Sequence, residues 1–473
     1  MTVKSEDVRH FIDGSSHDKH RLNDKMTDLE KTITLKRGIG LAICMLIGTG
    51  ILALPGLALS VGNVHEAILG WLLITFVTIP RVQICSRLGL RFPSTAGLAG
   101  YAEKAVGPWG RYSVSYLVSG SYLFGLPAIA FIGSEYMRQF FNLSGLGGTF
   151  CAILLVSLMF ISNLFGIRAI TLINYLALTV LFLLIGLIIV FNFDFVGSGL
   201  RIAGEALSGH GNVAPNIMWN VTALLFWAFL GWENLSFSLG EMKDPEKNVP
   251  RLYWLSFVLV AAIYVLLALI SVGASATGVS LKGAAGLSSL ALFIPGGNFL
   301  IWLIIVVLAA NACSWNFTAS RLIYAAGKTG VFPAVFGKLS KRNIPLASLV
   351  TLYAMSVSLI TGCYLLKVPI TAMMMLVNQN FIFLCGFIII AYWKTEIGWQ
   401  KWIFSVLSLL SLSFLASGFT WKVIYPLFLI GIGYFRFTVK KKDILSSQAV
   451  DSQSRQKLVM LEDSQELSQS MKQ

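Results

Sequence analysis

Charged side chains are scarce in this sequence. Asp, Glu, Lys and Arg make up only 12% of the 473 residues, while 56% of the residues are hydrophobic and the mean hydropathy is +0.75. Soluble domains typically carry about 25% charged residues. A soluble chain of this length could not stay in solution with so apolar a composition. The scarcity of charge therefore excludes a soluble protein and makes lipid the solvent for most of the chain.

Motifs of catalysis and metal binding are also absent from the sequence. It contains no CxxC, no HExxH, no GxSxG and no Walker nucleotide-binding sequence. We therefore expect neither an enzyme nor a bound metal or cofactor. The cysteines are scattered within or beside apolar runs, where small buried hydrophobic side chains are a better interpretation than metal or redox roles. They are Cys44, Cys85, Cys151, Cys313, Cys363 and Cys385.

The alternating short strands of a membrane β-barrel are lacking too, because stretches such as 176–191 and 299–310 are unbroken apolar runs. Runs long enough for a helix of about 20 residues to cross the bilayer recur along the chain. We therefore predict an all-α membrane protein of about twelve transmembrane helices. The predicted spans lie near residues 38–60, 65–86, 109–141, 149–165, 168–191, 216–240, 250–274, 297–326, 346–366, 370–393, 399–417 and 421–438.

The net charge is +14, and the distribution of the basic residues indicates how the chain is oriented in the membrane. The basic residues are spread through loops and are not gathered in one domain, so we expect no nucleic acid partner. With the N-terminus inside, few Lys or Arg residues fall in outer loops. This asymmetry predicts a multi-pass protein of the cell, or inner, membrane with both termini in the cytoplasm. The outer basic residues are Arg138, Arg201, Lys282, Lys367 and Lys422.

Two polar tails flank the predicted spans. Residues 1–36 and 439–473 are rich in Ser, Gln, Asp, Glu and Lys and cannot bury a core, so we expect mobile, solvated tails on the cytoplasmic side. The polar start also argues against a cleavable signal peptide before the first span. A regulatory role is the alternative to a plain solvated tail.

The first span contains several helix-weakening residues at its middle. Gly48, Gly50, Pro55 and Gly56 follow one another within nine residues. Glycine costs about 1 kcal/mol in a helix interior, and proline removes a backbone hydrogen bond. We therefore predict an interruption near Gly48 to Gly50. Close helix packing through small residues is the alternative.

The sixth span carries a similar disturbance around Gly231, which lies among Trp227, Trp232 and Glu233. Two interrupted spans in corresponding positions are typical of a transporter site. If the repeat has five helices, its second copy is inverted, and spans one and six become symmetry partners whose breaks meet at the midplane. Exposed N–H groups of one half-helix can then bind a carboxylate, and freed carbonyls of the other can accept from an ammonium. A zwitterion or an amine suits such a site.

Glu233 is the acid that we place deep within a span, where a charge costs at least about 2.5–3.5 kcal/mol. It is either a titrating group that couples a proton to movement or a structural partner for backbone groups freed at Gly231. Arg81 follows Pro80 in the second span, and we expect it near the cytoplasmic interface, where its stem would snorkel.

Other polar and aromatic residues are candidates for the lining of a central cavity. Aromatic faces can stack on an apolar side chain or a cation, although a single Trp more often serves packing. Amides inside a span either line the permeation path or pair across helices. The aromatic candidates are Trp227, Trp232 and Trp315, and the polar ones are Asn311, Thr318, Asn378, Gln379 and Asn380.

Short motifs follow one another in a fixed order from about residue 34 to residue 435. They are Ile47–Ile51, Arg91–Gly97 with Tyr101, Phe229–Glu233, Lys243–Arg251 and Gly327–Pro333. Their order and spacing resemble those of the amino acid/polyamine/organocation (APC) superfamily of transporters, including its bacterial amino acid antiporters and neutral amino acid exporters.

This resemblance implies a LeuT-type fold with a 5+5 inverted repeat. The repeats would be residues 37–194 and 216–393, followed by two accessory helices in 399–438. The resemblance also implies specific roles. The substrate carboxylate would bind at Gly48, Thr49 and Gly50, and its amino group at Phe229, Leu230 and Gly231, while Trp227 would stack on the substrate, Glu233 would be a pH-linked acid and Trp315 an outer gate.

Two positions depart from the pattern. Members that use protons through a Lys in the fifth span carry it a little beyond the Asn that Asn174 resembles, but residues 178–181 here read Leu-Thr-Val-Leu. That coupling mechanism is therefore in doubt for this chain. Arg87 stands where many members have an acid near the end of span two.

We therefore expect a secondary active transporter that moves amino acids or related amines by alternating access, as an exchanger or a proton-coupled permease. The alternative is a non-transporting amino acid sensor with a transporter fold. The expected partners are the small-molecule substrate, membrane lipid, and either a proton or a counter-substrate. The sequence leaves open the substrate's identity, the direction of transport and the oligomeric state, a homodimer included.

Overall fold

The computed structural model describes residues 33–92, 97–165, 167–417 and 421–442. Most of the predicted tails and part of the motif at residues 91–97 lie outside these ranges. The described chain is almost entirely helical, and its one β-bridge joins Ile33 to Met242. The longer helices are α2 (Leu35–Leu46), α3 (Thr49–Val61), α4 (Val64–Arg91), α5 (Gly97–Val106), α6 (Pro108–Phe140), α7 (Gly145–Asn163), α8 (Ile167–Phe191), α9 (Phe195–Leu207), α10 (Pro215–Leu225), α11 (Pro245–Ala276), α13 (Gly297–Lys328), α14 (Leu346–Leu365), α15 (Ile370–Thr395) and α16 (Trp399–Ala416).

The transmembrane count agrees with the prediction. Nine helices of the described chain are long and apolar enough to cross a membrane, the last being Trp421–Lys442, and the bent pair of α8 and α9 gives a tenth. The two interrupted segments, α2 with α3 and α10 with the turns that follow it, complete the predicted twelve. Each predicted span therefore coincides with a helix or an interrupted helix.

The first interruption falls where the glycines predicted it. Helix α2 ends at Leu46, Ile47 and Gly48 have non-helical backbone angles, and α3 begins at Thr49. A side chain at Gly48 would crowd the amide of Asn311, because an added Cβ would lie 3.0 Å from its Nδ2 atom. The break therefore brings bare backbone close to α13.

The second interruption lies in span six. Helix α10 ends at Leu225, and the 3-10 turn η1 (Phe226–Phe229) carries the chain to Leu230, which is extended. Gly231 follows with φ of +118°, a value that other residues rarely adopt. The 3-10 helix η2 (Asn234–Glu241) then completes the span. The predicted interruption around Gly231 is confirmed.

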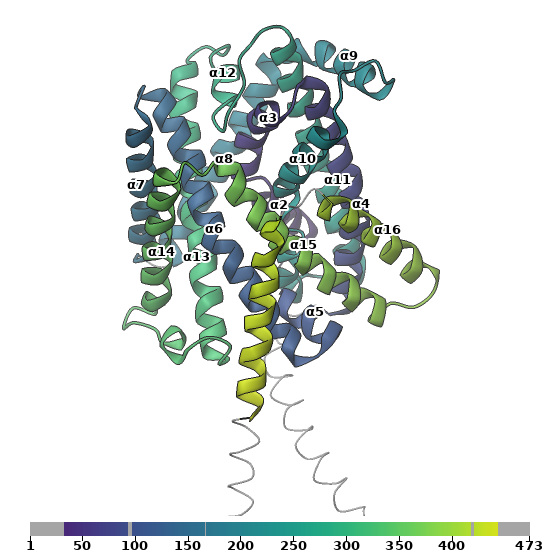
Figure 1. The fold of residues 1–473 in the computed structure, drawn as a ribbon, viewed down its shortest axis with the longest axis vertical. Helices are drawn as coiled ribbons and strands as arrows, with labels where there is room; N and C mark the ends of the chain where they lie inside the picture. The colour runs from purple at the N-terminus through teal and green to yellow at the C-terminus, as the bar shows by residue number, and fades with distance from the viewer. Residues whose placement is uncertain (1–32, 93–96, 166, 418–420, 443–473) are drawn as a thin grey trace, which may run out of the picture.

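The remaining helices enclose the two breaks. Figure 1 shows α7, α13 and α14 on one side and α4, α10 and α16 on the other, with α2 and α3 between them. Helix α6 packs against α7, α13 and α15, while α11 packs against α4 and α9. Large apolar side chains that face outward cover the surface that lipid would contact. Examples are Phe76, Phe150, Phe165, Leu183, Val190 and Phe299.

Backbone hydrogen bonds join both ends of span one to neighbouring segments of the chain. Ile33, just before α2, exchanges backbone hydrogen bonds of 2.9 Å with Glu241, the last residue of η2, and with Lys243 beyond it. At the far end of span one, the Gly283 N–H donates to the Gly56 carbonyl over 3.2 Å. Both half-helices of span one are thus tied to neighbouring backbone.

Candidate substrate-binding site

A cavity of about 40 Å³ lies where the two helix breaks meet. Small residues of span one and α6 leave the space, and aromatic side chains of several helices enclose it. None of the described lining residues is charged. The cavity is lined by Leu46, Gly48, Gly50, Ser121, Tyr122, Gly125, Leu126, Ile129, Trp227, Leu230, Trp315, Val377 and Phe381.

The span-one wall of the cavity is a helix N-terminus. Helix α3 begins at Thr49, its cap residue is Gly48, and among the described side chains none makes a capping hydrogen bond at this end. Such groups carry partial positive charge and bind anions. Gly48 and Gly50 both line the cavity, so a carboxylate could reach these groups. The side chain of Thr49 lies outside the described atoms.

The span-six wall consists of the broken backbone and an indole. Trp227 and Leu230 line the cavity. A Cβ added to Gly50 would lie 3.4 Å from Trp227 Cδ1 and 3.5 Å from Ala228 Cα, so the two spans approach closely at this point. The structure thus brings together five of the predicted site residues, namely Gly48, Gly50, Trp227, Leu230 and Trp315.

Aromatic residues close the other sides. Trp315 of α13 lies against Tyr122 of α6, with ring centroids 5.9 Å apart, and Phe381 of α15 completes the wall. Aromatic faces of this kind favour an apolar side chain or a cation. Trp232, in contrast, is fully buried between Tyr253 and Phe257 and is not among the lining residues.

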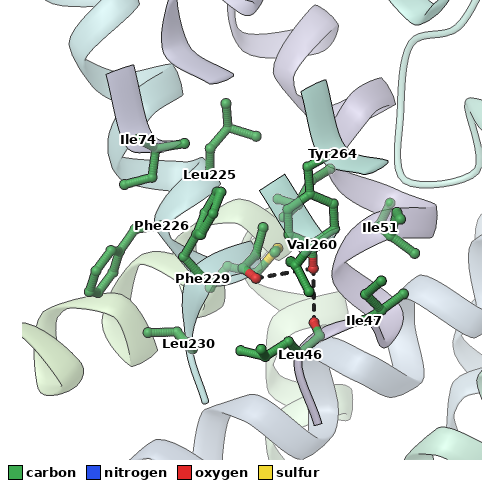
Figure 2. Packing of buried hydrophobic residues seen from close by; sticks show 14 of the residues in the cluster. Leu46, Ile47, Ile51, Ile74, Leu225, Phe226, Phe229, Leu230, Val260 and Tyr264 are labelled. Atoms are coloured by element: carbon green, nitrogen blue, oxygen red, sulfur yellow. Dashed lines mark hydrogen bonds between the residues drawn. The ribbon is translucent and has the colours of Figure 1, made fainter. Parts of the chain in front are cut away.

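Tyr264 of α11 bridges the two breaks, and the sequence reading missed it. Its hydroxyl lies 2.8 Å from the Leu46 carbonyl and 3.1 Å from the Ala228 carbonyl, and can donate to either. Figure 2 shows this hydroxyl pointing between the two interrupted segments. A lone tyrosine in the otherwise apolar stretch 257–270 is the sequence signal that could have revealed it.

Replacing Tyr264 by Phe should loosen both breaks. The Leu46 and Ala228 carbonyls would lose the one hydroxyl proton that they share in a buried place, which typically costs about 1–3 kcal/mol. We expect a lower unfolding temperature of the purified protein and slower substrate exchange. The matched control is Tyr175→Phe, because Tyr175 is exposed on α8 and its loss of a hydroxyl should change neither quantity. Equal behaviour of the two variants would contradict the bridging role.

Phe229, Gly231 and Glu233 lie behind the cavity wall. The Phe229 ring is fully buried and packs against Tyr264, with centroids 5.3 Å apart. The Gly231 N–H donates to Glu233 Oε2 over 3.2 Å. These predicted residues are thus neighbours of the site but are not among the side chains that line it.

The side chain of Arg81 does not snorkel but turns into the protein, so that expectation was wrong. Its guanidinium is buried, lies 3.4 Å from Glu233 Oε1 and donates to the Phe229 carbonyl over 2.5 Å. Span two runs beside the break of span six, so the side chain reaches inward to two acceptors and does not need to snorkel. The acid that looked isolated in the sequence has a cationic partner.

Two of the polar residues of span ten, Asn378 and Asn380, pair across helices. Asn378 donates to the carbonyls of Ala223 and Leu224 over 2.7 and 3.3 Å, and so holds the end of α10. Asn380 Nδ2 lies 3.4 Å from the Leu117 carbonyl. Of the two readings, these contacts favour helix pairing over a pore lining. Thr318 is exposed on α13, away from the cavity.

The described residues offer no group of three or more His, Cys, Asp or Glu side chains that could hold a metal ion. The five described cysteines are free and buried, as expected of small apolar side chains. The groups that the described residues place at this site are backbone dipoles, aromatic rings and, behind the wall, the ion pair of Arg81 with Glu233.

These features define a multi-pass integral membrane protein of the LeuT-type fold. The fold is similar to that of MhsT in complex with L-phenylalanine, with a TM-score of 0.56 and 14% sequence identity, covering 84% of this chain and 98% of that chain. The exact repeat boundaries at residues 37–194 and 216–393 stay a prediction.

The chain belongs to the amino acid permease family, whose model matches residues 33–449. It is 24% identical to the uncharacterized amino acid permease YecA of Bacillus subtilis (strain 168), covering 88% of this chain and 97% of that protein. It is 23% identical to the L-methionine/branched-chain amino acid exporter YjeH of Escherichia coli (strain K12), covering 88% and 98%. The putrescine transporter PotE of the same strain is 23% identical, covering 66% and 71%. The protein is therefore a transporter of the APC superfamily and not an enzyme.

Proposed function

We propose that this permease carries amino acids by alternating access through the cavity between its two helix breaks. One observation carries the proposal: the uncapped N-terminus of α3 faces the broken backbone of span six across an apolar, aromatic cavity. The first wall suits a carboxylate, and carbonyls freed at the second suit an ammonium. The aromatic rings suit the side chain.

A neutral side chain fits this cavity better than a second charge. None of its described lining residues is charged, whereas a diamine would need an acceptor for its second ammonium. Glu233 does not serve, because it lies behind the wall and is paired with Arg81. The relative that exports L-methionine and branched-chain amino acids supports an apolar substrate, and the putrescine-transporting relative marks the alternative.

The backbone ties at the two ends of span one are suitable gates. We propose that the bridge of Ile33 with Glu241 and Lys243 opens on one face and that the tie of Gly283 to Gly56 opens on the other. Opening one tie while the other stays closed would expose the cavity to one side at a time. The basic loops support a cytoplasmic face at the end that carries Ile33, in the cell or inner membrane.

Counterflow tests this function. The purified protein is reconstituted into liposomes, and the liposomes are preloaded with one candidate from the twenty amino acids, agmatine, cadaverine and putrescine. Uptake of the same compound in radiolabelled form is then measured and compared with uptake by empty liposomes. We expect exchange of neutral apolar amino acids. Binding of an amino acid without exchange would instead make the protein a sensor, and neither binding nor exchange of any compound by folded protein would refute the proposal.

Trp227 should contribute to affinity through its face on the cavity. Its replacement by Ala should weaken binding by about 1–2 kcal/mol, which corresponds to a Kd roughly 5- to 30-fold higher. Equilibrium binding of the exchanged substrate measures this directly. The matched control is Trp302→Ala on α13, since that indole is 48% exposed on the outer surface. Unchanged affinity in Trp227→Ala would argue against contact with the substrate.

A further inference from the structure

Arg81 makes an unusual set of contacts for a transmembrane residue. Its NH1 atom lies 3.4 Å from Glu233 Oε1 and 3.6 Å from Cys385 Sγ, and its NH2 atom donates to the Phe229 carbonyl over 2.5 Å. The guanidinium also lies 4.7 Å from the centroid of the Phe226 ring. The side chain is 9% exposed and that of Glu233 is 0% exposed. One cation from span two thus contacts both a carbonyl and a carboxylate of span six.

These two acceptors are the groups with which a broken helix binds a mobile cation. The Phe229 carbonyl lies at the last residue of η1, just before the extended Leu230. Freed carbonyls and a nearby carboxylate can coordinate Na⁺, and the carboxylate can instead bind a proton. Arginine is always charged in proteins and cannot release its proton. It therefore fills this position permanently.

The other groups around Glu233 cannot replace this charge. Cys385 of α15 approaches Glu233 Oε1 to 3.7 Å, and the nearby ionisable groups on α4 and α11 are the Cys85 thiol and the Tyr253 phenol. Thiols and phenols supply no positive charge in any protonation state. Among the described residues that face Glu233, Arg81 is the cation.

We propose that Arg81 is a tethered counter-cation that keeps Glu233 ionised and holds the break of span six closed without a proton or an inorganic cation. This inference rests on the proposed transport function and deepens it, because it assigns a coupling role at the same site. Glu233 then positions the backbone at Gly231 and does not carry a proton. Transport then moves no proton through this acid.

Charge-removal variants test the proposal through their pH dependence. For the wild type we expect exchange rates that vary less than about twofold between about pH 5.5 and about pH 8. Arg81→Met leaves a buried carboxylate without its partner, so its exchange rate at the higher pH should fall about tenfold or more and recover at the lower pH, where protonation removes the charge. The double variant Arg81→Met with Glu233→Gln should again be flat, because both charges are gone.

The same variants have a readout that needs no transport. The unfolding temperature of Arg81→Met should fall further at the higher pH than at the lower pH, and the double variant should lose that difference. The matched control is Arg138→Met, since Arg138 pairs with Glu135 on the surface of α6 at 2.6 Å with both side chains partly exposed. That control should keep the wild-type pH profile in both measurements.

Two results would overturn the proposal. One is a strongly pH-dependent wild type whose dependence disappears in Glu233→Gln alone, because Glu233 would then titrate in spite of Arg81. The other is an Arg81→Met variant with the flat profiles of the wild type. If no protein exchanges any compound, the proposed transport function fails, while the unfolding temperatures still decide whether Arg81 keeps Glu233 ionised.

Discussion

Gly50→Leu should abolish substrate exchange while the protein still folds. Gly50 lies in the first turn of α3 and lines the cavity. A Cβ at this position meets Leu54, Trp227 and Ala228 at 3.4–3.5 Å, which is ordinary van der Waals contact. The further carbons of leucine have to enter the cavity of about 40 Å³. They would cover the N–H groups that we assign to the carboxylate, so counterflow should drop to the level of empty liposomes.

Two companion variants separate blockage from general damage. Gly50→Ala adds only the tolerated Cβ and should keep a measurable part of the exchange. Gly186→Leu on α8 adds the same bulk at an exposed position with nothing within 4 Å of an added Cβ, so its exchange should equal that of the wild type. Normal exchange by Gly50→Leu would show that the substrate binds elsewhere.

Gly231→Ala should inactivate the protein by straining the break in span six. The backbone of Gly231 has φ of +118°, and holding an L-residue there costs about 1–3 kcal/mol. The neighbouring Trp232 is fully buried, so the chain cannot relax by turning that side chain outward. Relief of the strain would displace Leu230 from the cavity wall. We expect a lower unfolding temperature and loss of counterflow.

Gly278→Ala is the control for strain by itself. Gly278 has φ of +98° just after α11, with nothing within 4 Å of an added Cβ. It should therefore suffer a similar local strain far from the cavity, with reduced stability and retained exchange. If Gly231→Ala exchanges substrate as well as Gly278→Ala does, then the geometry of the break is not required for transport.

Hydropathy and the special chemistry of glycine explain how much of the fold could be predicted. Apolar runs of about 20 residues must become helices in lipid, which is why the predicted spans match the observed helices. Glycines at positions 48, 50 and 231 weaken their helices locally, and the two disturbed spans taken together predicted both breaks. The meeting of the breaks followed from repeat symmetry.

The contacts around the breaks could not be predicted in the same way. Arg81 and Tyr264 belong to spans two and seven, and their functions depend on which face of each helix turns toward span six. Rotation of a helix about its axis is set by packing against neighbours, and strongly apolar spans carry little amphipathic signal to reveal it. The expectation that Arg81 would snorkel came from its position along the helix alone. Its inward direction became visible only with the acceptors in place.

The position of a bound substrate shows whether the cavity between the two helix breaks is the binding site. We would determine the structure of the purified protein, by electron microscopy, with the amino acid that counterflow identifies. We expect substrate density between Gly48–Gly50 and Trp227–Leu230, with the carboxylate at the start of α3 and the side chain toward Trp315. Density outside this cavity, or a carboxylate bound by Arg81 in place of Glu233, would contradict this placement.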